Sequence, residues 1–212
     1  MPAIFTPRAT PVARGVLTLL VATVVVIPLV AMAWVRTPWA RGEHRQITQP
    51  IPFSHPLHVT ALHIDCRFCH REVERSQQAG LPSTELCVSC HNDATFASSV
   101  FTPVRRSLAT SRPIPWRRVT QLPAFVYFDH AAHVGHGVAC ETCHGRIDRM
   151  AVVSQARSLT MSWCVDCHRN PAASIRPLAT VTAMGWTGPR QGEALMRTYQ
   201  VHSLTNCSTC HR

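Results

Sequence analysis

Five copies of one pentapeptide, Cys-x-x-Cys-His, constrain this chain more than any other feature. Numbered 1 to 5 in chain order, the motifs consist of Cys66, Cys69 and His70; Cys87, Cys90 and His91; Cys140, Cys143 and His144; Cys164, Cys167 and His168; and Cys207, Cys210 and His211. All ten cysteines of the 212 residues belong to a motif. At this composition chance would supply about 0.03 copies, so the repeat reflects a chemical requirement.

Covalent haem attachment explains this spacing. The two thiols add across the vinyl groups of a haem, and the adjacent histidine reaches the iron as its proximal ligand. A thioredoxin-like site would use a single Cys-x-x-Cys, and zinc ribbons or disulfides do not require a histidine directly after each pair. The motifs therefore predict five covalently bound haems c, held by the ten cysteines and by five proximal histidines.

An apolar run near the N-terminus predicts a membrane anchor. Residues 16–35 carry no charge over twenty positions, which is longer than the roughly 7 to 15 apolar residues of a signal peptide. The competing reading is a cleaved signal with its cleavage site at residues 31–33. Because c-type haem is attached outside the cytoplasm, we expect residues 1–15 to be a cytoplasmic tail and residues 36–212 to lie on the periplasmic side of the bacterial inner membrane.

A second pattern divides the haem-binding region into repeats. Phe53-Ser-His55-Pro-Leu-His58 precedes motif 1, and Phe128-Asp-His130-Ala-Ala-His133 precedes motif 3. This element and the two motifs after it recur at an offset of about 75 residues. We therefore expect dihaem modules at about 50–95 and 125–172 and a fifth haem within 173–212. The proline-rich stretch 92–125 between the modules predicts a loop-like linker, with a short strand near residues 124–128.

Each iron needs a sixth ligand to remain closed to small molecules. The two repeated elements supply four histidines at matched positions, and we predict that they ligate four different irons as distal ligands. These histidines are His55, His58, His130 and His133. For the fifth iron the candidates are Met161 and Met150, with Met184, Met196, His63, His136 and His202 left open.

The same features predict a mostly irregular multihaem cytochrome c fold. Five haems for about 175 residues leave little room for a side-chain core, so haem must supply most of the buried apolar surface. Sixteen prolines interrupt long helices. We expect short α-helices around a haem array, attached to one transmembrane helix.

The basic charge is interpreted as counter-charge for haem. The formal net charge is +10, and all 21 basic residues are arginine. Five haems would bring ten propionates, equal in size to that excess, and guanidinium binds carboxylates in a bidentate manner. Nucleic acid is therefore not expected as a partner.

In combination, the anchor, the five motifs and several longer runs resemble a known family. The runs are FSHPLHV, VYFDHAAHV, and CETCHGRIDRM followed by LTMSWCVDCHRNP. Together they are similar to the pentahaem membrane-anchored cytochrome subunit of bacterial alternative complex III, and the histidine elements also resemble small cytochromes of the c3 and c7 type. The resemblance implies four bis-histidine haems and one His/Met haem. It also implies electrons received from quinol oxidation and relayed to a periplasmic carrier.

The partners that this resemblance implies are an iron-sulfur subunit, multispan membrane subunits, a monohaem cytochrome c and membrane lipid. The main alternative is a stand-alone membrane-anchored quinol dehydrogenase that feeds a soluble periplasmic reductase. A pentahaem nitrite reductase would need a lysine-ligated haem, and the chain contains no lysine. The chain is expected to carry electrons without catalysing a reaction by itself.

Overall fold

The charge-free run of residues 16–35 lies within one long helix in the computed structural model of the protein. This helix, α1 (Ala9–Val35), is long and apolar enough to cross a membrane. It begins before the predicted span because Pro11 falls in its first turn, where a backbone donor is not needed. The structure describes residue 7, residues 9–189 and residues 191–211, so residues 1–6 and 8 of the predicted tail lie outside the described residues.

The chain divides into two units, of which the first ends at Glu43 and the second begins at His44. All five motifs belong to the second unit. Each motif contains a short helix, as the sequence predicts. These helices are α2 (Cys66–Cys69), α3 (Thr84–Val88), α6 (Cys140–His144), α7 (Met161–Arg169) and α9 (Cys207–Cys210).

Other short helical segments make up the remaining regular structure of the described residues. They are the π-helical turn η1 (Pro56–Ala61), the 3-10 turns η2 (Ala94–Ala97), η3 (Ser99–Phe101), η4 (Ile147–Arg149), η5 (Pro171–Ala173) and η6 (Leu178–Thr180), and the helices α4 (Thr102–Thr110), α5 (His130–Gly135) and α8 (Gly192–Thr198). The strand expected at residues 124–128 is wrong, because only an isolated bridge joins Val126 to His211 in that stretch.

The linker between the modules is more ordered than a loop. Pro103 lies in the first turn of α4, where proline is compatible with a helix. Val104 and Ile114 are buried with Ile51 in a small apolar cluster. Packed against this cluster are Cys87, Val88, Phe96, Phe101 and Trp116. The linker therefore forms a cover over motif 2, which the prolines alone did not predict.

The side-chain core is small, as the sequence predicts for a haem-rich protein. The buried apolar residues of the described chain are Ile51, Val73, Val104, Ile114, Val134, Ala139, Ile175 and Val181. A core of this size is insufficient to stabilise a unit of about 170 residues on its own.

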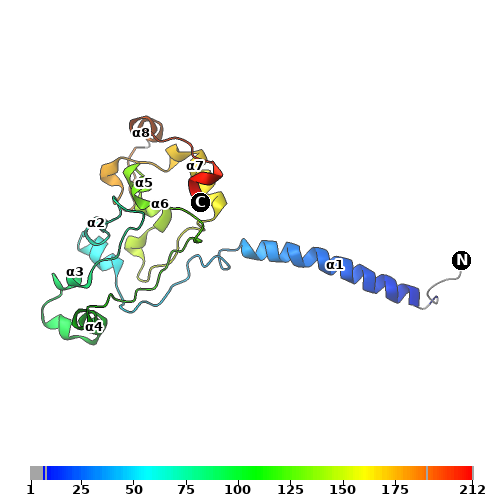
Figure 1. The fold of residues 1–212 in the computed structure, drawn as a ribbon, viewed down its shortest axis with the longest axis horizontal. Coiled ribbons are helices and arrows are strands. Elements are labelled where there is room, and N and C mark those ends of the chain that lie inside the picture. Colours follow the sequence, from blue (N-terminus) through cyan, green and yellow to red (C-terminus); the bar gives the residue numbers. More distant parts are fainter. Residues whose placement is uncertain (1–6, 8, 190, 212) are drawn as a thin grey trace. The chain divides into compact units, whose positions relative to one another are not determined.

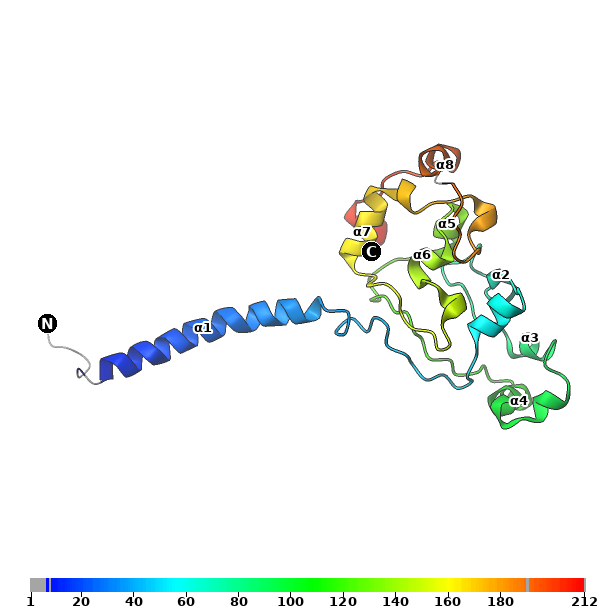
Figure 2. The ribbon, with the colours of Figure 1, turned by 180° about the vertical axis from the view of Figure 1, so that it is seen from behind.

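The two modules dock on each other in a reciprocal manner. In the first module, η1 packs against η4, and Thr60 Oγ1 donates to the Asp148 carbonyl oxygen at 3.0 Å. In the second module, the backbone N–H of His130 donates to the Gln77 carbonyl, and that of Ala131 donates to the Ser76 carbonyl. Each histidine element thus rests on the segment that follows the first motif of the other module. Figures 1 and 2 show the resulting unit, with α3 and α4 at one end and α7 with the C-terminus at the other.

Candidate haem-attachment sites

The first histidine element holds His58 from two sides. His58 Nδ1 lies 2.9 Å from the Ser54 carbonyl oxygen, and Phe53 stacks on the same ring at a centroid distance of 4.3 Å. A carbonyl oxygen can only accept, so Nδ1 carries the proton and Nε2 is left free to bind a metal. His55 meets Phe53 edge-on at 4.9 Å, but its buried Nδ1 has no hydrogen-bond partner.

The second element repeats this arrangement with one more hydrogen bond. His133 Nδ1 lies 2.6 Å from the Asp129 carbonyl oxygen, and Phe128 stacks on the ring at 4.5 Å. His130 Nδ1 lies 2.7 Å from the Gln77 carbonyl oxygen. The Asp129 carboxylate accepts from two backbone N–H groups and fixes the start of α5.

Three of the four element histidines face a motif histidine. The ring centroids are 6.1 Å apart for His58 and His91, 6.4 Å for His130 and His144, and 5.9 Å for His133 and His168. An imidazole nitrogen binds a metal at about 2 Å, so two imidazoles on opposite sides of one iron have ring centres about 6 Å apart. The structure thus leaves room for one iron between each pair.

His55 belongs with motif 1 by its electrostatic neighbours. Burial and, next in size, the nearby His70 lower the pKa of His55 to about 4. Burial likewise lowers the pKa of His144 to about 4 and lowers that of His133. These rings are neutral at pH 7, and the neutral imidazole is the form that ligates iron.

The cysteine thiols reveal the order in which the motifs adjoin. Contact with Cys140 of motif 3 lowers the pKa of the Cys66 thiol of motif 1, and contact with Cys66 raises that of Cys140. Burial raises the pKa of the Cys69 thiol, and Cys87 of motif 2 raises it further. Motif 1 therefore lies between motifs 2 and 3.

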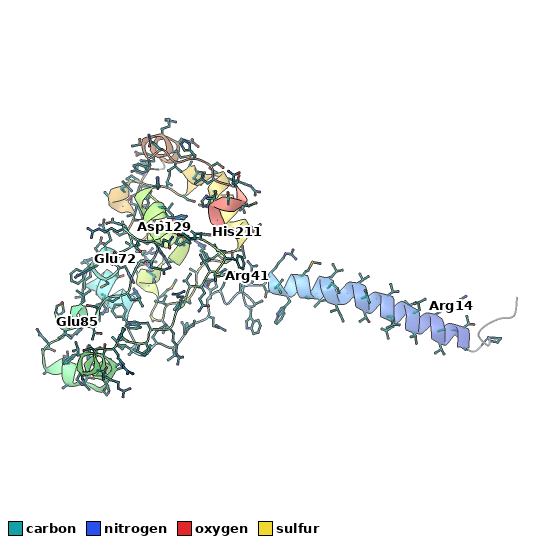
Figure 3. The ribbon with its side chains drawn as sticks, in the orientation of Figure 1. Arg14, Arg41, Glu72, Glu85, Asp129 and His211 are labelled. Carbon is teal, nitrogen blue, oxygen red and sulfur yellow. The ribbon has the colours of Figure 1, made fainter. Side chains whose placement is uncertain are left out.

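The remaining motifs continue the same row. Burial, together with repulsion from Cys167 and Cys164 of motif 4, raises the pKa of Cys143 to about 12. Burial also raises the pKa of Cys164, and Cys210 of motif 5 adds to this rise. The motifs therefore adjoin in the order 2, 1, 3, 4, 5. In Figure 3, Glu85 beside motif 2 and His211 of motif 5 lie well apart in the second unit.

The fifth site differs from the other four. His211 has Phe125 as its ring neighbour, with the centroids 5.8 Å apart. Met161 begins α7, one turn before Cys164, and is exposed. Met150 lies against Gly145, directly after motif 3. Of the two candidate ligands, only Met161 shares a helix with a motif that adjoins motif 5.

The donor set fits haem better than zinc. All ten cysteines are free thiols in the structure. No group of three or more His, Cys, Asp or Glu side chains that could hold a metal ion occurs among the described residues. A structural zinc site would need four such ligands together, whereas a haem needs two thiols on one edge and an imidazole on each face of the iron.

Comparison with known proteins agrees with this donor set. The family "Cytochrome c7 and related cytochrome c" matches residues 126–212. The "Menaquinone reductase, multiheme cytochrome c subunit" of Nitratidesulfovibrio vulgaris (strain Hildenborough) is 36% identical over 178 residues, which cover 82% of this chain and 73% of that protein. The chain belongs to this family of multihaem cytochromes c. The predicted fold class and the covalent attachment of haem c are therefore confirmed, since family membership implies them.

Sequence reasoning missed the groups that orient the ligands of this multihaem cytochrome. The backbone carbonyl oxygens of Ser54 and Asp129 each accept a hydrogen bond from the Nδ1–H of the histidine four positions later. Both are residue types that favour the start of a helical turn, so their place between Phe and the first His was an available signal. The Gln77 carbonyl carried no such signal, because Gln77 lies 53 residues before His130 in the sequence.

Proposed function

We propose that this cytochrome is the electron-transfer subunit of a membrane complex that exchanges electrons with the quinone pool. It would hold five haems c on the periplasmic side of the bacterial cytoplasmic membrane, and α1 would anchor it there. When bound, haem c supplies one-electron chemistry at each motif. The observation that carries the proposal is the succession of motifs 2, 1, 3, 4 and 5, each adjoining the next, because a continuous series of one-electron sites suits a relay between two partners.

The chain's own residues would hold and shield these sites. The motif cysteines would form the thioether bonds, and His70, His91, His144, His168 and His211 would be the proximal ligands. The distal ligands of motifs 1 to 4 would be His55, His58, His130 and His133, in that order. With both faces of an iron occupied by imidazole, small molecules are excluded, which favours electron transfer over catalysis.

Met161 would be the distal ligand at motif 5. Substitution of Met161 by Ala should then open one iron and produce a high-spin ferric signal in electron paramagnetic resonance, since that iron loses a strong-field ligand. Met150→Ala is the matched control and should leave all five irons low-spin. A high-spin signal from Met150→Ala alone would assign the ligand to Met150 instead.

The assignment of the electron donor and of the partner subunits follows from the family resemblance and from the similar protein together. The resemblance to alternative complex III implies electrons leaving quinol, and the relative's name assigns it to a menaquinone reductase. One row of sites carries electrons in either direction, because the potentials of the two partners set the driving force. We assign to the complex an iron-sulfur subunit, multispan membrane subunits and a monohaem cytochrome c, with a periplasmic carrier at the far end.

Three measurements test this function. Purification in mild detergent should recover the chain together with iron-sulfur and multispan proteins, and intact mass should show five haems. The isolated subunit should not be reduced by a quinol analogue at a useful rate, because the proposal places the quinone site on its partners. Rapid reduction of the isolated subunit would support the stand-alone quinol dehydrogenase and contradict the proposal.

A further inference from the structure

The cover over motif 2 carries an unusual charge. Residues 94–128 contain five arginines and no acidic residue. Four of these arginines have exposed side chains that form no ion pair among the described residues. They are Arg106, Arg112, Arg117 and Arg118. We call these four residues the motif 2 arginine patch.

The fifth arginine has a structural role and is excluded from the patch. The Arg105 guanidinium donates to the carbonyl oxygens of Phe96 and Ser98 and to Thr102 Oγ1. It therefore fastens η2 and η3 to the start of α4. Of the five arginines, Arg105 is thus the one whose side chain joins segments of the cover.

The patch is presented by a fixed backbone. Ser107 Oγ donates to the Arg112 carbonyl at 2.6 Å and also hydrogen bonds to Thr84 of α3. The side-chain amide of Gln49 donates to the Arg117 carbonyl oxygen at 2.9 Å and accepts from the Arg117 backbone N–H at 3.0 Å. Because both anchor points are set by contacts with other segments, the guanidinium groups stand on a preorganised surface, which lowers the ordering cost of binding.

The patch also lies at an end of the motif row. Phe101 of the cover contacts the His91 ring at 4.9 Å, and Cys87 packs against the cover's apolar cluster. Motif 2 adjoins motif 1, and its helix α3 lies with α4 at one end of the second unit (Figure 1). An end of such a row is accessible to an outside electron carrier, and four exposed positive charges attract a partner of opposite sign.

We propose that the motif 2 arginine patch is the docking surface for an acidic electron-carrier protein. This inference rests on the proposed function. It adds which end of the row of motifs the carrier approaches and that the carrier's surface is acidic. Docking forms and breaks no covalent bond. Once the carrier is bound, single electrons pass between it and the site at motif 2. Guanidinium groups pair with surface carboxylates of the carrier in a bidentate manner.

Binding of an acidic flavodoxin to the full-length holoprotein in detergent tests this proposal. Reversal of two patch charges, Arg117→Glu with Arg118→Glu, should weaken the Kd by about tenfold or more at low ionic strength, and the difference should shrink at high salt. The control is Arg169→Glu with Arg197→Glu, an equal charge change on exposed residues of α7 and α8, and it should alter the Kd by less than about twofold. Basic mitochondrial cytochrome c should show no preference for the unsubstituted patch.

The outcomes separate the patch from the proposed function. Equal weakening in both variants would mean attraction by net charge alone and would overturn the docking surface. An unchanged Kd with a shifted midpoint potential would mean that the arginines hold haem propionates, which would also overturn it. If the unsubstituted protein binds flavodoxin through the patch but no haem is reduced by its hydroquinone form, the docking surface stands and the proposed electron transfer fails. Unchanged haem content by intact mass shows that each variant has folded.

Discussion

The two dihaem modules carry the same histidine element in different surroundings. In the first module the element is the π-helical turn η1, and the Nδ1 atom of its leading histidine, His55, is buried without a partner. In the second module the element is α5, capped by Asp129, and His130 donates its Nδ1 proton to Gln77. The sequence repeat therefore specifies ligand positions, while the neighbouring segment specifies how firmly each ligand is held.

The modules also differ in what surrounds their motifs. Motif 2 is covered by its own linker and lies at an end of the row, whereas motif 3 adjoins motifs 1 and 4. Behind motif 3, Arg176 forms a buried ion pair with Glu141 at 2.7 Å. In motif 1 the position of Glu141 is occupied by Arg67, which pairs with Asp65 and Glu74 on the surface. Position in the row, more than motif sequence, should decide what each site contributes to stability.

The largest expected effect comes from removing a central haem. Cys140→Ser with Cys143→Ser should abolish folded protein, because the row loses the site that joins the two modules and the side-chain core is too small to replace it. Cys87→Ser with Cys90→Ser should remove one haem by intact mass and leave a protease-resistant protein with four. Comparable yields of both variants would show that the position in the row is unimportant.

The next effect concerns the potentials of the two leading sites. A histidine that donates its Nδ1 proton is a more basic ligand and stabilises the ferric state. We therefore expect the haem at motif 3 to have a lower midpoint potential than the haem at motif 1. His130→Met and His55→Met should each raise the midpoint potential of one haem by on the order of 100 mV. Potentiometric titration should show that the component of lower potential disappears in His130→Met. Loss of the same component in both variants would contradict this difference.

These comparisons show what the sequence could and could not predict. The motif helices were predictable because covalent haem attachment requires a local pattern that is visible within a few residues. The order of the motifs was not predictable, since it depends on contacts such as that between Cys66 and Cys140, which lie far apart in the chain. The cover over motif 2 was missed because its prolines indicated a loop, although Pro103 is compatible with the first turn of α4.

A moderate effect is expected from the ion pair behind motif 3. Arg176 and Glu141 have side chains that are 7% and 19% exposed, so Arg176→Met leaves a buried carboxylate without its cation and should destabilise the holoprotein by about 3 kcal/mol. Arg67→Met breaks exposed pairs and should cost less than about 1 kcal/mol. Denaturant unfolding of both variants, followed by the Soret band, measures the two costs. An equal cost for the two arginines would mean that burial does not distinguish the modules.

The smallest effect is a pH dependence confined to the first module. The Asp148 side chain is 5% exposed, and its hydrogen bonds from Arg146 hold the pKa of the carboxyl below its ordinary value. A depressed pKa contributes stability above the unfolded value, near 4, and this contribution is lost as the pH falls through the folded value. Because the Asp148 carbonyl supports η1 through Thr60, hydrogen exchange of residues 56–61 should accelerate toward pH 4 more than that of residues 130–135.

Asp148→Asn is the matched variant for this effect, because it removes the titrating group and preserves the backbone carbonyl. It should lower the free energy of unfolding by about 1 kcal/mol at pH 7. The rate of amide hydrogen exchange of residues 56–61 should vary less with pH in this variant than in the unsubstituted protein. The two proteins should converge in the acid range, where Asp148 is protonated. Faster exchange of both elements to the same extent would instead indicate general acid unfolding, and the support of η1 by Asp148 would then not distinguish the first module from the second.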